Sequence, residues 1–337
     1  MKLDSFILLL LAGTAALAAC GKAGLQGTDV RFRVSGNTAV RAAFSGDIAG
    51  NGTERIDWEK DDRIRILSPQ ATPSDGGDTH WADYRIKDVR DEGSSSLANV
   101  EPAGQAVLSW GEGAHDFHAV YPSPTIADGI SLENNVFHGI IPDVQHLEWE
   151  ETEGVPDRTR IYLLASAQGI EPSRNDPVRL KFQPAFTALS FTLSLEDKNP
   201  VPLRAFRLES TGGPVAGAFR VTMGEDWTMD TDGTVSDAVS IDLDRTLEQG
   251  GFLTFTVLCL PLDLSGLKAV FETAYGTKTL KLSRKDGSPI VFPACHKARI
   301  TGLVLPGAPD ISFTVDITPW EDAQDEFEAE PTTLENN

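Results

Sequence analysis

Leu189-Ser190-Phe191-Thr192-Leu193-Ser194-Leu195 alternates apolar and polar side chains without interruption. Because successive side chains of a β-strand point to opposite faces of a sheet, this alternation predicts a half-buried strand. Clusters of Gly, Pro, Ser and Asp separate further segments of this kind, as turns do between short strands. The best helical candidate, 145–153, is short and acidic, so we predict an all-β protein of antiparallel sandwiches. The other alternating segments are 30–34, 62–67, 179–182, 254–257 and 311–317.

Two domains are expected from the length of the chain and from one break in its pattern. The strand at 189–195 is followed by Glu196-Asp197-Lys198-Asn199-Pro200, where charge, Asn and Pro interrupt the alternation. This break divides the chain into 30–196 and 200–320. Each part has the size of one β-sandwich domain.

The first twenty residues predict export and lipidation. Lys2 precedes an apolar run, and Leu17-Ala18-Ala19-Cys20 closes the segment with the pattern of a bacterial lipoprotein cleavage site. We therefore expect a signal peptide at 1–19, a lipid on Cys20, and a Gly-rich tether at 20–29. The alternative is an ordinary secretory leader or a short membrane helix, but about a dozen apolar residues are too few to span roughly 30 Å of hydrocarbon.

The negative charge of the chain argues against polyanionic partners. The formal net charge is −21 at pH 7, so the protein should be repelled by nucleic acid and by anionic lipid surfaces. No Lys or Arg follows Arg299, and the segment 321–337 is strongly acidic. We interpret that segment as a solvated tail, with a binding role as the alternative.

The cysteines and histidines predict neither a disulfide framework nor a metal site. With Cys20 assigned to lipid, Cys259 and Cys295 allow at most one disulfide, and no metal-binding CxxC or HxxxH spacing occurs. Asp230-Thr231-Asp232-Gly233-Thr234 resembles the start of a calcium loop, but the later ligand positions do not fit. We therefore predict a tight hairpin turn there, no metal site and no cofactor.

The sequence offers no recognisable catalytic constellation, so we expect no enzyme. The segment 57–62 places Trp58 among carboxylates, as sugar-cleaving sites often do. We favour a polar turn at this segment, with Trp58 packed on a sheet edge. The six histidines stand apart from any Ser, Cys or Asp at the spacing of a catalytic triad. Four aromatic residues could stack on sugars, although most such residues in a sandwich pack in the core: Trp81, Tyr84, Trp110 and Trp149.

A series of strand-like segments follows in a characteristic order along the mature chain. They are Thr38-Ala39-Val40-Arg41-Ala42-Ala43-Phe44-Ser45-Gly46, Ile56-Asp57-Trp58-Glu59-Lys60-Asp61-Asp62-Arg63-Ile64-Arg65-Ile66, Phe117-His118-Ala119-Val120-Tyr121-Pro122, Leu163-Leu164-Ala165-Ser166, 178–189, 292–303 and Ile317-Thr318-Pro319-Trp320. This succession resembles the Mfa-like fimbrillins, lipoprotein pilins of Gram-negative gut and oral anaerobes.

The resemblance implies two tandem transthyretin-like antiparallel β-sandwich domains and assembly into fimbriae by strand exchange. In that family an Arg-specific protease outside the cell removes the first strand of the precursor, and a strand from a neighbouring subunit fills the groove. Here the first strand is 30–34 and the implied cut follows Arg41, because Arg31 and Arg33 lie inside the strand. The implied donor strand is 311–317, whose apolar side chains are Ile311, Phe313, Val315 and Ile317.

Two features depart from the pattern of the family. Cys295 stands where the family more often has Gly, and Gly21-Lys22-Ala23-Gly24 lacks the carboxylates that commonly follow the lipidated cysteine in these bacteria. The resemblance implies an outer-membrane lipoprotein at the cell surface, held to the membrane by its lipid anchor, with other fimbrial subunits as partners. The alternative is a monomeric surface lipoprotein that binds a host glycan or protein.

Overall fold

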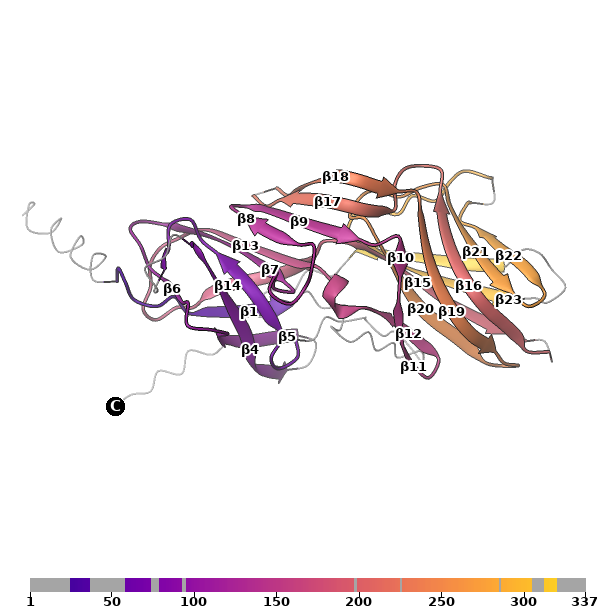
Figure 1. Cartoon of the computed structure of the whole chain (residues 1–337), viewed down its shortest axis with the longest axis horizontal. Coiled ribbons are helices and arrows are strands. Elements are labelled where there is room, and N and C mark those ends of the chain that lie inside the picture. The colour runs from indigo at the N-terminus through magenta and orange to yellow at the C-terminus, as the bar shows by residue number, and fades with distance from the viewer. Residues whose placement is uncertain are drawn as a thin grey trace, which may run out of the picture.

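The computed structural model describes residues 25–36, 58–73, 79–92, 95–196, 199–224, 226–284, 286–304 and 312–319. Strands dominate this part of the chain, and its one helical element is a short 3-10 turn, η1 (Arg158–Arg160). The molecule is elongated, with a barrel at one end and two packed sheets at the other (Figure 1). The prediction of an all-β protein is confirmed.

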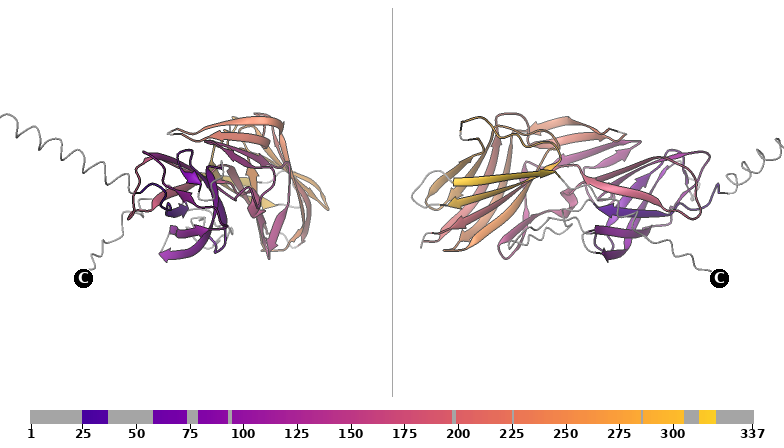
Figure 2. Two further views of the ribbon diagram at one scale, coloured as in Figure 1. Left: turned by 60° about the vertical axis from the view of Figure 1, so that its left-hand side comes forward. Right: turned by 180° about the vertical axis from the view of Figure 1, so that it is seen from behind.

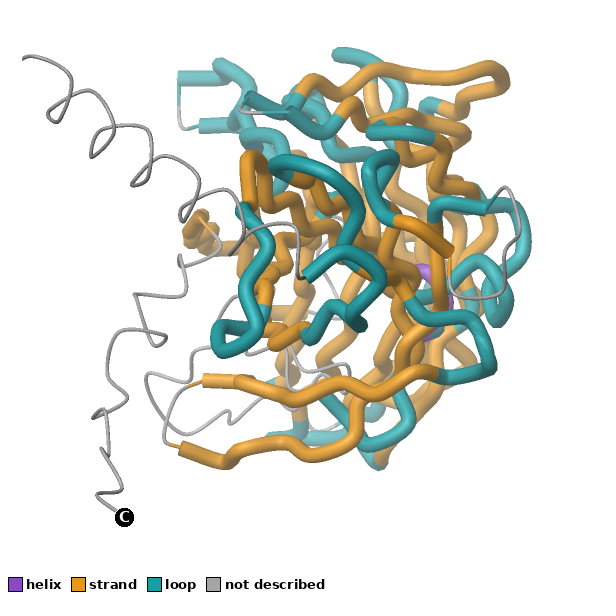
Figure 3. Tube along the Cα trace, turned by 90° about the vertical axis from the view of Figure 1, so that its left-hand side faces the viewer, coloured by secondary structure: helices purple, strands orange, loops and turns teal. Residues whose placement is uncertain are grey.

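Seven strands form the barrel, which faces the viewer in Figure 3. The first strand closes it, because β1 pairs in parallel with β14 and antiparallel with β5. In β14 every second side chain is buried, since the barrel interior receives one face of each strand. In order around the barrel the strands are β1 (Phe32–Gly36), β14 (Val178–Pro184), β13 (Leu163–Ile170), β7 (His115–Tyr121), β2 (Arg63–Leu67), β4 (Trp81–Glu92) and β5 (Ser95–Pro102).

Two sheets pack face to face at the other end, and we call this unit the sandwich. Their inner faces meet through four phenylalanines, with Phe191 and Phe206 at a ring-centroid distance of 5.0 Å and Phe255 and Phe271 beside them. One sheet is β10 (Val144–Gln145), β19 (Ala238–Leu247), β16 (Val201–Ser210), β21 (Leu267–Thr273) and β22 (Gly276–Lys281). The other is β11 (Leu147–Glu150), β12 (Glu153–Pro156), β20 (Phe252–Cys259), β15 (Thr187–Leu195), β23 (His296–Val304) and β24 (Ser312–Pro319).

A third sheet joins the two ends of the molecule. Strands β8 (Ser131–Glu133) and β9 (Val136–Ile141) come from the first half of the chain, and β17 (Ala216–Thr222) and β18 (Thr228–Ser236) from the second. Beneath them the ring of Tyr162 lies 5.4 Å from Phe137 and 5.9 Å from Phe219. A short antiparallel pair, β3 (Thr72–Pro73) with β6 (Leu108–Ser109), completes the described strands.

The division of the chain differs from the predicted one. The break at 196–200 falls between β15 and β16, which both belong to the sandwich, and the change from barrel to sandwich occurs between β14 and β15. Nearly all side chains of β15 are buried because it lies between β20 and β23 in the middle of its sheet. A buried central strand followed by a charged loop has the same sequence pattern as the last strand of a domain followed by a linker. The sequence therefore predicts a boundary at 196–200 that the strand pairing does not have.

Two further expectations need correction. The first domain is a closed barrel by its strand pairing, and four strand pairs are parallel (β1–β14, β10–β19, β12–β20 and β15–β23), so the sheets are not purely antiparallel. The helical candidate 145–153 is wrong as well, because this segment forms short strands along the edges of the sandwich. Edge positions favour strands here, since their backbone groups complete the ladders of β19 and β20.

Candidate strand-exchange site

β1 occupies a slot in the wall of the barrel. It pairs with β14 over all five of its residues, whereas its pairing with β5 covers only Arg33, Val34 and Ser35. Val34 is fully buried and Phe32 is 5% exposed, so the inward face of the strand belongs to the barrel core. Loss of β1 would expose an apolar groove and leave backbone groups of both neighbouring strands without partners.

Aromatic packing holds β1 from the inside. The ring of Phe32 meets Tyr84 and Phe117 edge-on, at centroid distances of 5.1 Å and 5.3 Å. The Tyr84 hydroxyl accepts a hydrogen bond from the backbone N–H of Leu108 at 3.0 Å, and burial raises the pKa of this phenol. A cavity of about 420 Å³ lies beside the first residues of β1, between that strand and the end of β5.

The residues before β1 are tied to the barrel. The backbone N–H of Val178 donates to the carbonyl of Arg31 at 2.8 Å, and the Arg31 guanidinium donates to the carbonyl of Asn175 at 2.7 Å. Peptide bonds held in this way are poor protease substrates, in line with the preference for Arg41 over Arg31 and Arg33. Cys20 and Arg41 themselves lie outside the described residues. Within the described ranges, no helix is long and apolar enough to cross a membrane.

The predicted donor strand is β24, at the edge of the six-stranded sheet (Figure 2). It pairs antiparallel with β23 from Leu303 opposite Ser312 to His296 opposite Pro319. Val315 and Ile317 are half-buried against the sandwich core, and Thr314 and Asp316 are exposed. Ile311 lies outside the described residues, and Phe313 is placed by its backbone. The strand therefore rests on its own domain, with its inner face apolar and its outer face polar.

The segment after the implied cut is anchored by Trp58 and Asp62. Trp58 is 2% exposed and packs edge-on against Tyr121 and Phe182, so the expectation that it lies on a sheet edge is wrong. A turn does follow it, with Asp61 at φ 72°. The Asp62 carboxylate accepts from the backbone N–H of Glu59 at 2.8 Å, from the Tyr121 hydroxyl at 3.2 Å and from Arg158 at 3.1 Å. This arrangement fixes the start of β2, and nothing in it resembles a pair of catalytic carboxylates.

Burial of Asp62 makes the stability of the barrel depend on pH. Desolvation raises the pKa of Asp62 to about 6, against the lowering effects of the Glu59 N–H and Arg158. Because the pKa of Asp62 is higher in the folded than in the unfolded state, the protonated carboxyl favours folding. Its contribution to the free energy of unfolding is complete below pH 3.8 and is lost as the pH rises through 6. Between pH 4 and pH 7.5 we expect the free energy of unfolding of the unsubstituted chain to fall by on the order of 3 kcal/mol relative to that of the Asp62→Asn variant. Denaturant unfolding of both chains at the two pH values measures this, and parallel pH profiles would contradict it.

The four aromatic residues considered for glycan stacking do not form a platform. Tyr84 and Trp110 are buried at 2% and 1% exposure. The Arg65 guanidinium covers the face of Trp81 at 3.5 Å, and Arg245 lies over Trp149 at 4.6 Å in the sandwich. The rings serve packing and cation–π contacts, as the favoured interpretation has it, and the alternative of a glycan platform from these four rings is not supported.

The segment 230–234 is neither a calcium loop nor a hairpin turn. It lies inside β18, where the register slips between the pairs Gly217–Val235 and Phe219–Thr231, and Gly233 takes a φ of 105°. The Asp232 carboxylate pairs with His138 at 2.7 Å. The Asp-Gly dipeptide marks a bulge in a long strand, because β17 offers a partner on both sides of it. Among the described residues, no group of three or more His, Cys, Asp and Glu side chains could hold a metal ion.

Cys259 and Cys295 are free thiols. Burial raises the pKa of Cys259, and it raises that of Cys295 to about 12, so neither is a reactive thiolate at neutral pH. Cys295 has a φ of 53°, in the left-handed region that favours glycine. The departure noted in the sequence, Cys in place of Gly, therefore falls at a position whose backbone suits Gly. A side chain there costs roughly 1 to 2 kcal/mol of backbone strain.

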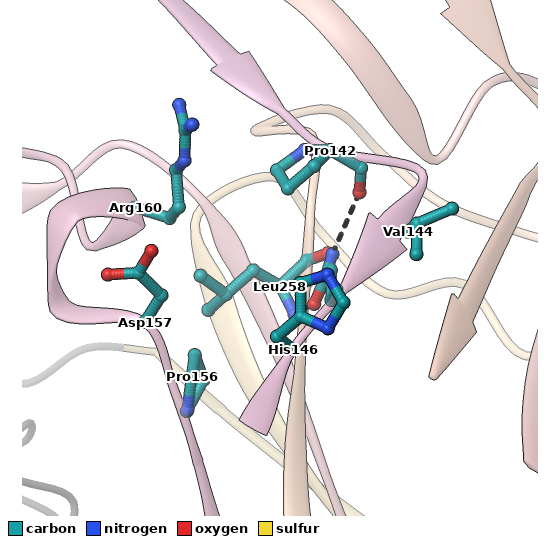
Figure 4. Close-up of a pocket in the computed structure, with 8 residues that line it drawn as sticks. Pro142, Val144, His146, Pro156, Asp157, Arg160 and Leu258 are labelled. Atoms are coloured by element: carbon teal, nitrogen blue, oxygen red, sulfur yellow. Dashed lines mark hydrogen bonds between the residues drawn. The ribbon is translucent and has the colours of Figure 1, made fainter. Parts of the chain in front are cut away.

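A small cavity opens beside β10, near η1 (Figure 4). Its volume is about 130 Å³, and Asp157 and Arg160 lie on one side with Val144 on the opposite side. The buried amide of Gln145 donates to the carbonyl of Leu258 at 2.7 Å and accepts from its N–H at 3.1 Å, in place of a strand partner. The lining mixes apolar and polar side chains, and it contains no set of residues with a recognisable catalytic geometry.

Comparison with known proteins shows similarity of fold. No protein-family model and no curated protein matches this chain. A solved structure described as a "putative cell adhesion protein" from Bacteroides uniformis matches with a TM-score of 0.54 and 15% sequence identity, over 87% of this chain and 98% of that one. A second, with the same description, from Bacteroides ovatus has a TM-score of 0.52 and 17% identity, over 87% and 98%. The tip fimbrial protein Mfa3 of Porphyromonas gingivalis, truncated at its C-terminus, matches with a TM-score of 0.45 and 11% identity, over 87% and 100%. The chain therefore shares the fold of the two Bacteroides proteins over most of its length.

Proposed function

We propose that this protein is a structural subunit of a fimbria or adhesive fibre at the cell surface, and that it carries no enzymatic activity. The observation that carries the proposal is the position of β1, which closes the barrel and is held by only three residue pairs on its β5 side. A strand from another copy that took this slot would join two subunits through backbone hydrogen bonds and buried apolar side chains.

The donor in this proposal is β24. Its sequence has apolar residues at Phe313, Val315 and Ile317, separated by Ser312, Thr314 and Asp316. The strand it would replace has a similar alternation, with Phe32 and Val34 of β1 buried in the barrel core and Val30 buried just before the strand. Because an inward apolar face and an outward polar face are what the slot requires, β24 is a suitable occupant.

The predictions for the N-terminal segment complete the proposal. Lipidation of Cys20 after removal of 1–19 would anchor the precursor in the outer membrane, and cleavage after Arg41 would remove the anchor together with β1. We propose two transthyretin-like domains for the barrel and the sandwich, with residues 20–29 as the tether and 321–337 as an acidic tail.

Limited digestion of the mature chain with an Arg-specific protease tests this function. We expect concentration-dependent multimers, seen by size-exclusion chromatography with light scattering, and a new N-terminus at Ala42 by intact-mass analysis. The Arg41→Ala variant, treated in the same way, should stay monomeric. A chain that is cut after Arg41 and remains monomeric at high concentration would overturn the proposal.

The second candidate is a monomeric surface lipoprotein that binds a host glycan or protein. The cavity near η1 favours it, because apolar Val144 and Leu258 lie beside His146, Asp157 and Arg160, a mixture that suits sugar hydroxyls. This candidate predicts no multimers after cleavage, and glycan binding that is lost in Asp157→Ala. Glycan-array binding of the uncleaved chain therefore separates the two functions.

A further inference from the structure

We propose that the outer face of β14 selects the incoming strand by charge, so that Asp316 of a second copy lies beside Arg179 or Lys181 of the barrel. This inference rests on the proposed function and names the contact that sets the partner. In this inference, β1 matches the charge of the outer face of β14 less well than the donor strand that replaces it.

The outer face of β14 is basic in an acidic protein. Arg179 and Lys181 are exposed, and the residues between and beside them, Val178, Leu180 and Phe182, are buried in the barrel. The formal net charge of the chain is −21, so this basic strand face contrasts with the charge of the protein as a whole. Any strand in the β1 slot must place its outward residues next to these two cations.

β1 does not match this face. In the parallel register, Arg33 is the direct neighbour of Arg179 and Ser35 is the neighbour of Lys181. Like charges on adjacent strand positions repel each other, while both guanidinium groups also have other polar or electrostatic contacts. The Ser35 hydroxyl is buried without a hydrogen-bond partner, which is a further cost. The pairing of β1 with β5 covers only three residues, and a cavity of about 420 Å³ lies beside it, so β1 makes fewer contacts on its β5 side than on its β14 side.

β24 already sits against a strand of the same pattern. In β23 the outward residues Lys297 and Arg299 alternate with buried Ala298 and Ile300, and Asp316 lies directly opposite Arg299. β14 repeats this order of basic outward and apolar inward residues. Moving β24 from β23 to β14 therefore exchanges one basic neighbour of Asp316 for another, and it removes Arg33 from beside Arg179.

The alternation of β24 leaves two registers that bury its apolar residues in the slot. With Phe313 in the place of Phe32, Asp316 takes the place of Ser35 and meets Lys181. With Val315 in the place of Phe32, Asp316 takes the place of Arg33 and meets Arg179. Both registers place the carboxylate beside a cation, but the position of Ser35 is buried and that of Arg33 is partly exposed, so the register in which Asp316 meets Arg179 is favoured.

The test measures binding of a labelled peptide of residues 311–319 to the full mature chain after Arg-specific cleavage, at a concentration too low for multimers. The parent peptide should bind the parent chain about fivefold to tenfold more tightly than a peptide with Asp316→Lys, and high salt should narrow the difference. On a chain carrying Arg179→Asp and Lys181→Asp the preference should reverse. A chain with Arg207→Asp and Lys281→Asp, two exposed positions of the sandwich, has the same net charge and should keep the parent preference.

The outcomes separate the two claims. Equal binding of both peptides to every chain would overturn the charge selection and leave strand exchange intact. Absence of parent-peptide binding to the cleaved chain would overturn strand exchange through β24, and the charge selection with it. Reversal of the preference in the control chain would also overturn the inference, since net charge alone would then explain the effect.

Discussion

Replacing Phe32 by Ala is expected to lower the free energy of unfolding of the uncleaved chain by about 3 to 5 kcal/mol. The ring is 5% exposed and contacts Tyr84 and Phe117 edge-on within the barrel core. Truncation removes the buried apolar surface and leaves a void next to a cavity that already exists beside β1. Because β1 holds the barrel closed, the loss should appear as earlier unfolding of the whole barrel.

Guanidinium unfolding followed by circular dichroism measures this effect. Tyr275→Ala is the matched control, since that aromatic ring is 59% exposed at the turn between β21 and β22 and its loss should change little. A change below about 1 kcal/mol for Phe32→Ala would show that β1 contributes little to the closed barrel. Burial of apolar side chains in the proposed groove would then contribute too little to drive strand exchange.

Replacing Val315 by Asp in the donor strand should reduce assembly of the cleaved chain by at least about a hundredfold. In the β1 slot this residue would take a position like that of Val34, which is fully buried. A carboxylate there has no partner, and burial of an unpaired charge costs several kcal/mol. In its own sheet Val315 is only half-buried on an edge strand, so the monomer should still fold.

Thr314→Asp provides the control for this experiment, because Thr314 is the exposed neighbour on the same strand and would face outward in the slot. Light scattering after Arg-specific cleavage should show multimers for Thr314→Asp and monomers for Val315→Asp, while circular dichroism confirms that both fold. If the two variants assemble equally well, the inward face of β24 does not enter a groove and another strand must be the donor.

Local sequence rules succeeded where one strand has one buried face. β14 alternates buried and exposed residues along its whole length, and the same alternation predicted strands at 30–34 and 62–67. The left-handed backbone of Cys295 also had a signal in the sequence, because the resemblance to the fimbrillins implies Gly at this position. No signal of this kind marked the bulge at Gly233, since Asp-Gly serves tight turns and bulges alike.

The sequence by itself determined the all-β class and the alternation of β1 and β24, and it predicts an export signal that ends at Cys20. Each of these depends only on residues that are close together in the chain, because the period of a strand and the pattern of a leader are local properties. Only the tertiary structure decided that β1 closes a barrel, that Trp58 is buried, and that Arg33 neighbours Arg179. These depend on pairing between segments far apart in the chain, and strand register is fixed by the packing of the whole sheet.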